Sequence, residues 1–307
     1  MNPYYRDYAD FLAEHFKGKV QKLTVNAGFS CPNRDGTLGR GGCVYCNNTS
    51  FSPSLGGGSV AAQLEAGKRF FERKYPQMRY VAYFQSYTNT HGEMRRLLSL
   101  YNEALQVDKV DGLIIGTRPD CIPDGLLGEL SAIGKPVIME YGAETSHDAT
   151  LESINRCHTW EQTVDAVRRT VAAGLPVGLH LIMGLPGEDT GMMLETIRRV
   201  AALPVDTVKL HQLQIIKGTT LANEVARDGS SGVLSFRGLG IHEFSVEEYI
   251  DLCVEVIKII SASNPRIAIE RFTSQAPAGL LVSPRWGLKN YQFTNLFHNR
   301  LKATLRL

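Results

Sequence analysis

The sequence has no long hydrophobic run, almost no net charge and no low-complexity tract or internal repeat. Its longest apolar stretches, at 110–116 and 177–187, are interrupted by charged residues, His or Gly. Neither approaches the roughly 18 residues needed to span a bilayer. The 33 basic against 31 acidic residues give a formal charge of +2, which excludes a generally basic nucleic-acid coat but not a local basic patch. With 43% hydrophobic residues in 307, the chain can bury a large core.

Signals for export are also missing. The first residues, Met-Asn-Pro-Tyr-Tyr-Arg-Asp, lack a basic start followed by an apolar segment, so we expect no secretion signal. A protein that is not exported keeps its cysteines reduced, so the six cysteines are expected to be thiols or metal ligands. These features predict a cytoplasmic protein of enzyme size with no membrane segment.

Nucleotide-binding glycine motifs are absent, whereas strands and helices alternate clearly. No Gly-x-Gly-x-x-Gly follows the first expected strand, and no Walker motif is present. Strands are expected at 22–29, 80–85, 112–116, 136–141, 177–183 and 207–215. Helices are expected at 61–74, 93–105, 162–173, 190–202 and 246–262. About six repeats of this alternation predict parallel strands with right-handed crossovers. Polar clusters after several strands favour a barrel over a doubly wound sheet.

Three cysteines directly follow the first expected strand. Cys31, Cys43 and Cys46 are spaced C-x11-C-x2-C, and the loop between them contains Gly36, Gly39, Gly41 and Gly42. Glycine-rich loops can fold tightly around a bulky inorganic centre. Three thiolates suit a cluster of four irons that leaves one iron open. The alternatives are unliganded thiols or a structural zinc site, whose fourth ligand would be Cys121, Cys157 or His158.

Several motifs together resemble those of radical SAM enzymes of the YhcC-like family, a relative of the elongator-type group. The cysteine loop carries two of them, Phe-Ser-Cys-Pro-Asn-Arg-Asp-Gly-Thr from position 29 and Gly-Gly-Cys-Val-Tyr-Cys-Asn from position 41. The others are Tyr-Phe-Gln-Ser-Tyr-Thr-Asn-Thr from 83, Gly-Thr-Arg-Pro-Asp-Cys from 116, Asn-Arg-Cys-His from 155, Leu-Ile-Met-Gly-Leu-Pro-Gly-Glu from 181 and Lys-Leu-His from 209. The resemblance covers the chain from Lys22 to about Trp286.

The resemblance implies an α/β fold, a partial (β/α)6 TIM-type barrel of parallel strands with a C-terminal α/β extension. We expect a helical lead-in at 1–20, the barrel core at 21–225 and an extension at 226–307 that covers the barrel and contacts substrate. Within the extension, 226–240 is rich in Gly and Ser and is expected to be a mobile surface loop.

The resemblance also implies two cofactors and a set of binding residues. Cys31, Cys43 and Cys46 would ligate a [4Fe–4S] cluster whose open iron binds S-adenosylmethionine (SAM), which is cleaved reductively to a 5′-deoxyadenosyl radical. The residues expected to contact SAM are Tyr45 by the adenine, Gln85, Ser86 and Thr88 at the amino group, Glu144 and Arg156 at the ribose and carboxylate, and His180 and Met183 on the fifth strand.

Some of these roles have alternatives in ordinary packing. Relatives usually carry Gln at the position of Glu144, so Glu144 and Arg156 could instead pair with each other. Relatives also carry Gly where this chain has Cys157, for which a buried thiol is the simplest interpretation. Tyr45 could merely pack in its loop, and both His180 and His211 could be core residues.

The substrate is open between two classes, and a third hypothesis needs no substrate. Seven basic residues, one acidic residue and five aromatic residues at 266–307 suit tRNA, or a helix whose aromatic side chains pack on the barrel. A small metabolite or peptide could instead bind Arg118, Asp120 and Glu188. A zinc-stabilised, non-catalytic binding module is the third hypothesis. Reductive cleavage of SAM requires a one-electron donor such as flavodoxin or ferredoxin.

Overall fold

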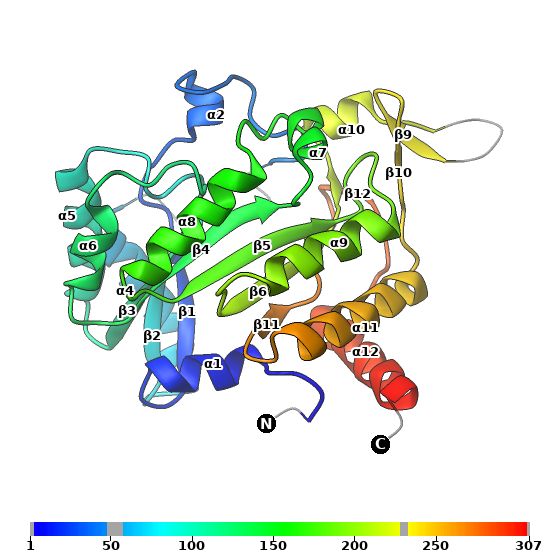
Figure 1. The fold of residues 1–307 in the computed structure, drawn as a ribbon. Helices are drawn as coiled ribbons and strands as arrows, with labels where there is room; N and C mark the ends of the chain where they lie inside the picture. The colour runs from blue at the N-terminus through cyan, green and yellow to red at the C-terminus, as the bar shows by residue number, and fades with distance from the viewer. Residues whose placement is uncertain (1–2, 48–57, 228–232, 306–307) are drawn as a thin grey trace.

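The structure, a computed structural model, describes residues 3–47, 58–227 and 233–305. Its centre is a parallel sheet of seven strands, in the order β1-β2-β3-β4-β5-β6-β11, curved into an open half-barrel (Figure 1). The strands are β1 (Val20–Val25), β2 (Arg79–Phe84), β3 (Val110–Thr117), β4 (Val137–Glu144), β5 (Val177–Met183), β6 (Thr207–Gln212) and β11 (Ala268–Arg271). The expected parallel half-barrel is therefore confirmed.

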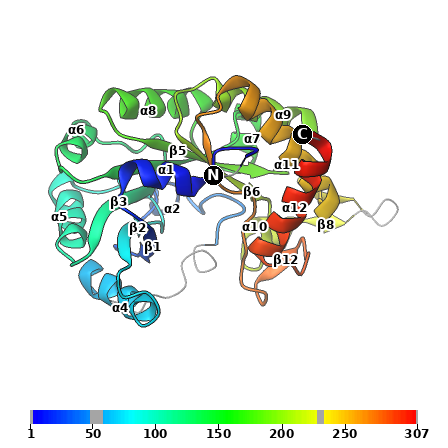
Figure 2. The same cartoon turned by 90° about the horizontal axis from the view of Figure 1, so that it is seen from below.

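Helices cover the convex outside of the sheet, as Figure 2 shows from below. They are α4 (Val60–Glu72), α5 (Met94–Leu105), α6 (Leu126–Ser131), α8 (Trp160–Ala172), α9 (Thr190–Ala201) and α11 (Val246–Ser263). Further helices are α1 (Tyr8–His15), α2 (Pro32–Asp35), α7 (Asp148–Ser153), α10 (Thr220–Glu224) and α12 (Asn290–Leu305). Strands β2 to β5 are buried along nearly their whole length, as expected when helices cover one face and a filled interior the other.

Helix α1 closes the lower opening of the half-barrel (Figure 2). Phe11 on α1 and Phe16 at its end are buried in a cluster with strand residues such as Tyr83 and Ile114. A Cβ atom at Gly112 would lie 2.8 Å from the Phe16 ring and 2.4 Å from the carbonyl oxygen of Pro136. Glycine at this position of β3 therefore lets α1 approach the sheet. The polar cavity described below opens at the other end.

The seventh strand comes from the segment expected to cover the barrel. β11 pairs in parallel with β6, with Ala268 opposite Thr207. It has only four residues, so its sequence carries little of the periodicity by which longer strands are recognised. The C-terminal segment thus extends the sheet itself, beyond the six strands that the sequence predicts.

The prediction of a mobile loop at 226–240 is wrong for its described part. Residues on both sides of 228–232, which lie outside the described residues, form the antiparallel strands β8 (Ala226–Arg227), β9 (Leu234–Phe236) and β10 (Leu239–Ile241). Arg237 and Gly238 have φ of 52° and 81°, the left-handed pair that joins two strands in a tight hairpin. Two more short strands, β7 (Ile215–Ile216) and β12 (Leu281–Ser283), pair beside them.

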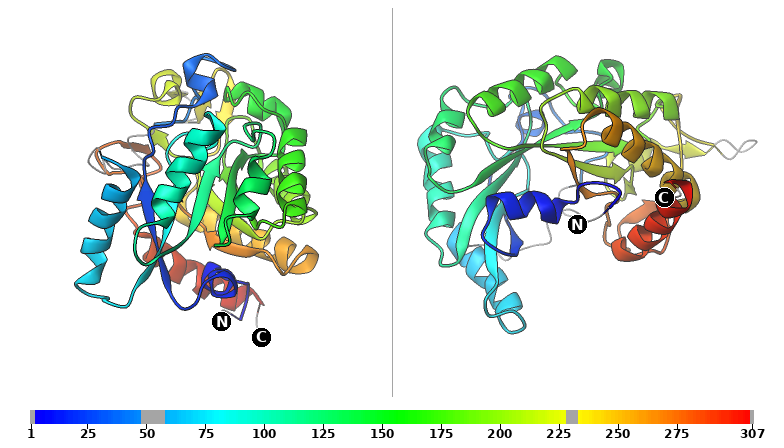
Figure 3. Two further views of the ribbon diagram at one scale, coloured as in Figure 1. Left: turned by 90° about the vertical axis from the view of Figure 1, so that its left-hand side faces the viewer. Right: turned by 60° about the horizontal axis from the view of Figure 1, so that its bottom comes forward.

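The C-terminal aromatic residues pack inside the protein. Phe272, Phe293 and Phe297 are 5% exposed or less, and the Trp286 ring stacks on Phe293 at 5.8 Å. Figure 3 shows α12 alongside α11, with both termini at the end of the molecule opposite the cysteine loop. Tyr291 remains 62% exposed. Packing is therefore the role of most of these rings, and base stacking is excluded for the buried ones.

No helix in the described ranges has the length and apolarity required to cross a membrane.

Candidate functional site

The cysteine loop folds over the upper end of the half-barrel. Cys31 precedes α2, whose first residue is Pro32, and the backbone N–H of Cys46 donates to the carbonyl oxygen of Cys43 at 3.0 Å. Gly42, with φ of 78°, lies so close to Arg34 that a Cβ atom would be 2.7 Å from its Nε. All three cysteines are free thiols and line one cavity. The loop thus brings Cys31, Cys43 and Cys46 to one wall, as their spacing predicts.

Cationic donors surround these thiols. Arg156 donates through Nη1 to the Sγ of Cys43 at 3.5 Å, and Arg34 donates through Nη2 to the carbonyl oxygen of Cys46 at 2.9 Å. Burial and the neighbouring Cys43 raise the pKa of Cys46 to about 11. The positive charges of the two arginines favour an anionic group bound at the cysteines.

The loop after β2 forms a second wall. Gln85, Ser86 and Thr88 all line the cavity, and the backbone N–H of Thr88 donates to the carbonyl oxygen of Ser30 at 3.2 Å, beside the cysteine loop. The fully buried Asn89 holds this loop to the sheet by donating to the carbonyl oxygens of Phe84 at 3.0 Å and Gly116 at 2.7 Å. The sequence predicts the three lining residues but not the bracing by Asn89.

Arg156 and Glu144 form an ion pair above β4. Nη2 of Arg156 lies 3.2 Å from Oε1 of Glu144 and donates to the carbonyl oxygen of Gly142 at 2.5 Å. A Cβ atom at Gly142 would lie 2.5 Å from this Nη2 and 2.6 Å from Oε1, so glycine is required for the pair. Glu144 has a φ of 66°. The expected alternative, pairing of the two charges, is confirmed, yet both residues still line the cavity. Among the described residues, the buried Nε of Arg156 has no hydrogen-bond partner.

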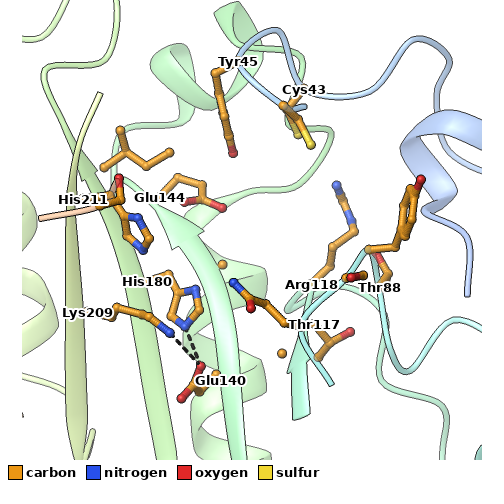
Figure 4. Close-up of a pocket in the computed structure, with 18 of the residues that line it drawn as sticks. Cys43, Tyr45, Thr88, Thr117, Arg118, Glu140, Glu144, His180, Lys209 and His211 are labelled. Carbon is orange, nitrogen blue, oxygen red and sulfur yellow. Dashed lines mark hydrogen bonds and ion pairs between the residues drawn. The ribbon is translucent and has the colours of Figure 1, made fainter. Parts of the chain in front are cut away.

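The other predicted contacts divide between the cavity and the core. Tyr45 and His180 line the cavity, and in Figure 4 Tyr45 lies beside Cys43 while His180 lies deeper, beside Glu140. Met183 is absent from the cavity wall and is 1% exposed in the main core. Its expected role is therefore not supported by its position, because alternate residues of a strand point to opposite faces.

Charged side chains from five strands meet at the lower end of the cavity, where Glu140, His180 and Lys209 line its wall (Figure 4). Lys22 lies 3.2 Å from Glu140 and 3.0 Å from Glu270, and Lys209 lies 3.5 Å and 2.8 Å from the same two carboxylates. His180 contacts Glu140 through Nε2 at 2.8 Å. Sequence reasoning missed this network, although a charged residue within an otherwise buried strand, such as Glu140 in β4, is a signal for it.

The family models decide the class of protein. The Radical SAM superfamily model matches residues 31–200, and the Radical_SAM C-terminal domain model matches residues 205–303. The chain belongs to the radical SAM superfamily. It is therefore an enzyme whose cofactors are a [4Fe–4S] cluster and SAM. The resemblance on which the sequence analysis rests is confirmed, and the non-catalytic binding module is excluded.

Relatives and solved structures agree with this family. The chain is 38% identical to protein YhcC of Escherichia coli (strain K12), with 90% of this chain and 85% of YhcC covered. A tRNA uridine(34) acetyltransferase of Methanocaldococcus jannaschii is 32% identical over 36% of this chain and 20% of its own length. The structure of archaeal Methanocaldococcus infernus Elp3 superposes with a TM-score of 0.62 at 17% identity, covering 93% of this chain and 63% of that chain, and shows the shared fold.

The cavity fits both radical SAM cofactors. Three reduced cysteines beside arginine donors suit an anionic cluster, in which each cysteine binds a different iron. The buried Nε of Arg156 lacks a hydrogen-bond partner in the part of the chain that the structure describes and suits a carboxylate. Within residues 3–47, 58–227 and 233–305, no three Cys, His, Asp or Glu side chains converge on a site for a single metal ion.

Two further expectations need correction. Cys157 is exposed rather than buried, with its Sγ 3.2 Å from Oδ1 of Asn33 and a backbone φ of 57°, the conformation for which glycine is favoured.

The second concerns the three charged residues expected to bind a small metabolite or peptide. Arg118 and Asp120 bind each other in a buried, two-bond ion pair at 2.9 Å and 2.8 Å. Glu188 is buried outside the cavity wall and accepts from Thr145 at 2.6 Å. Asp120 and Glu188 are thus not exposed to a ligand in this cavity.

Proposed function

We propose that Cys31, Cys43 and Cys46 hold a [4Fe–4S] cluster at which this enzyme cleaves SAM reductively to start radical chemistry. The observation that carries the proposal is that the three cysteines share one cavity with the polar ends of β2 and β4. When bound and reduced by an external donor, the cluster would supply one electron to the sulfonium of SAM, whose cleavage would give methionine and a 5′-deoxyadenosyl radical able to take a hydrogen atom from an organic substrate.

The side chains around the cysteines would bind the polar parts of SAM. Gln85, Ser86 and Thr88 offer oxygen atoms to the amino group. Arg156 offers its unpartnered Nε to the carboxylate, while its Nη2 stays on Glu144. Glu144 offers its remaining carboxylate oxygen to the ribose, and Tyr45 forms a wall for the adenine. His180, held by Glu140, is assigned to the charged network below SAM rather than to SAM itself.

The test is the formation of 5′-deoxyadenosine, measured by mass spectrometry after anaerobic reconstitution with iron and sulfide and reduction by dithionite in the presence of SAM. We expect product from the wild type and its loss in Cys43→Ala. Cys253→Ala is the matched control, because Cys253 lies in the buried face of α11 and not in the cavity, and it should retain product. Wild-type protein that carries the cluster but makes no product would contradict the proposal.

A one-electron donor is part of this function, since reductive cleavage consumes one electron that the protein's own side chains do not supply. We propose flavodoxin or ferredoxin for this role. Replacing dithionite by a reduced flavodoxin or ferredoxin should sustain 5′-deoxyadenosine formation, and failure of both proteins while dithionite works would exclude this class of donor.

For the substrate we propose tRNA, on two grounds. The partial relative named tRNA uridine(34) acetyltransferase covers 36% of this chain, and the C-terminal segment keeps Lys289 and Lys302 exposed. Arg300 instead contacts Asp251, and Arg306 lies outside the described residues. Because most of the aromatic rings are buried, tRNA would be bound mainly by the charged side chains. The affinity for tRNA should therefore depend strongly on salt concentration.

Salt-dependent tRNA binding tests this substrate. The double variant Lys289→Gln, Lys302→Gln should bind isolated tRNA more weakly and with a smaller slope of log affinity against log salt, by about 1 to 2. The control is Lys17→Gln, Lys19→Gln, because these exposed lysines follow α1 and lie outside the C-terminal segment. If both double variants lost the same amount of affinity for tRNA, the C-terminal segment would not be the tRNA-binding surface.

A small organic molecule is the second candidate substrate. The specific observation in its favour is that the cavity continues below the cysteines into the half-barrel, down to Glu140, Lys209 and Arg271. A concave site lined by apolar groups and a few charged ones is typical of small-molecule sites.

A further inference from the structure

A charged network with one excess positive charge lies at the lower end of the cavity, where three of its members, Glu140, Lys209 and Arg271, line the wall. It is built from Lys22, Lys209, Glu140, Glu270 and Arg271, which come from strands at both ends and the middle of the sheet. Two lysines and two glutamates balance one another through the four contacts of 2.8–3.5 Å described above. Arg271, at the end of β11, is not part of that balance.

Arg271 has no carboxylate partner within the described ranges of the chain. Its Nη2 lies 3.1 Å from Nδ1 and 3.3 Å from Nε2 of His211, and its buried Nε has no hydrogen-bond partner among these described residues. Both Arg271 and His211 line the cavity. Burying a guanidinium nitrogen without a hydrogen-bond partner is costly, so a bound group that accepts from this Nε would be stabilising.

The two neighbouring histidines, His211 and His180, are neutral and do not balance the charge of Arg271. Burial, together with the positive charges of Arg271 and Lys209, lowers the pKa of His211 well below its usual value, and burial with Lys209 also lowers the pKa of His180. Both imidazoles are therefore neutral near pH 7. The surroundings of Arg271 disfavour a further cation, which indicates that an anion is the missing partner.

We propose that Arg271 binds an anionic group, a carboxylate or a phosphate, of a small organic substrate that occupies the half-barrel below SAM. The planar guanidinium suits both groups because each presents two oxygens to neighbouring N–H donors. The cavity that begins at Cys31, Cys43 and Cys46 extends without interruption to Arg271, so an anchored substrate would present its carbon atoms towards SAM. This inference rests on the proposed radical function with the second candidate substrate, a small organic molecule, and names the charged group of that molecule that Arg271 would bind.

Stabilisation by small anions tests this site. The thermal unfolding midpoint of the reconstituted wild type is measured against rising acetate or inorganic phosphate, with ionic strength held constant by potassium chloride. We expect at least one anion to raise the midpoint in a saturable manner, while acetamide, which has the shape of acetate without its charge, does not. Response to acetate alone identifies a carboxylate, and response to phosphate alone identifies a phosphate.

Variants locate the effect at Arg271. In Arg271→Gln the apparent affinity for the anion should fall by about tenfold or more. The affinity of Arg271→Lys should lie between those of the wild type and Arg271→Gln, because lysine keeps the charge without the paired donors. Arg285→Gln is the control, since Arg285 is exposed and donates only to the carbonyl oxygen of Val282. Unchanged affinity in Arg271→Gln, or no saturable anion effect on the wild type, would overturn the proposal.

Two further arms separate this inference from its alternatives. Anion binding is repeated with saturating SAM, and it should persist, whereas competition would assign Arg271 to the SAM carboxylate and overturn the inference. It is also repeated with isolated tRNA, and displacement of the anion by tRNA that depends on Arg271 would replace the small molecule by RNA. Because no reductant is present, a failure here is distinct from a failure of the wild type to form 5′-deoxyadenosine.

Discussion

Arg156 contacts three parts of the site at once. It donates to Sγ of Cys43, to the carbonyl oxygen of Gly142 and to the carboxylate of Glu144, and its Nε is left over. A side chain with this position can orient SAM against the cluster while its own rotamer is fixed by its neighbours.

Arg156→Gln should therefore weaken SAM binding by roughly 10- to 100-fold, because a hydrogen-bonded charge pair with the carboxylate is lost. Equilibrium dialysis of SAM with the anaerobically reconstituted variant measures this. The control is Arg168→Gln, an exposed arginine on the outer face of α8. SAM affinity equal to that of the wild type would show that Arg156 serves the fold and not the ligand.

The sequence identifies the residues of the site whose roles depend on local spacing. The three cysteines and the Gln85–Thr88 segment are predicted because each set lies within one loop. The network of Lys22, Glu140 and Lys209 is not, since Lys22 and Glu140 are 118 residues apart in the sequence and these side chains meet only when the sheet curves. The same holds for Arg271, which reads in the sequence as one more basic residue of a basic tail.

Strand β3 is the element whose packing depends on one glycine. Gly112 faces both the carbonyl oxygen of Pro136, beside β4, and the ring of Phe16, which follows α1. This contact joins the sheet to the helix that closes its lower end.

Gly112→Ala should lower the free energy of unfolding by about 1–3 kcal/mol, because the added methyl group overlaps backbone as well as a ring. Gly128→Ala, in the middle of α6, meets nothing within 4 Å and should instead raise it by about 0.5–1 kcal/mol. Urea unfolding followed by circular dichroism compares the two. Equal stability of both variants would refute the role of Gly112.

Long periodic elements were predictable, and short ones were not. β5 begins and ends at the expected residues, and α9 differs by a single residue. β11 and the strands β8 to β10 have two to four residues each, too few to show a period, and they are defined by the neighbours with which they pair. The sequence therefore predicts the half-barrel but not its seventh strand.

For the whole molecule, the buried network links stability to pH. Burial opposes ionisation of Glu140, but Lys209 and Lys22 outweigh it and hold the pKa of Glu140 well below its usual 4.5. The unfolded chain therefore binds more protons than the folded one as the pH falls below about 4.5. The contribution of Glu140 is complete above that pH and is lost as the pH falls towards the folded-state pKa.

Glu140→Gln should lower the free energy of unfolding near pH 6 by roughly 3–5 kcal/mol, because two buried lysines lose a carboxylate. It should also flatten the dependence of unfolding free energy on pH below about 4.5. Urea titrations from pH 6 to acid measure both effects. The control is Glu161→Gln, at an exposed position in the first turn of α8, which should keep the wild-type dependence of unfolding free energy on pH. If this dependence were as steep in Glu140→Gln as in the control, Glu140 would not be the group that links stability to pH.

The central claim is that three cysteines hold a cluster whose fourth iron is open to SAM. Electron paramagnetic resonance of the reconstituted, dithionite-reduced enzyme tests it directly, recorded with and without SAM and beside Cys43→Ala. The account predicts the signal of a reduced [4Fe–4S] cluster whose g values shift when SAM is added, and loss of that signal in the variant. A protein that takes up zinc but no iron, or a cluster signal that SAM leaves unchanged, would contradict it.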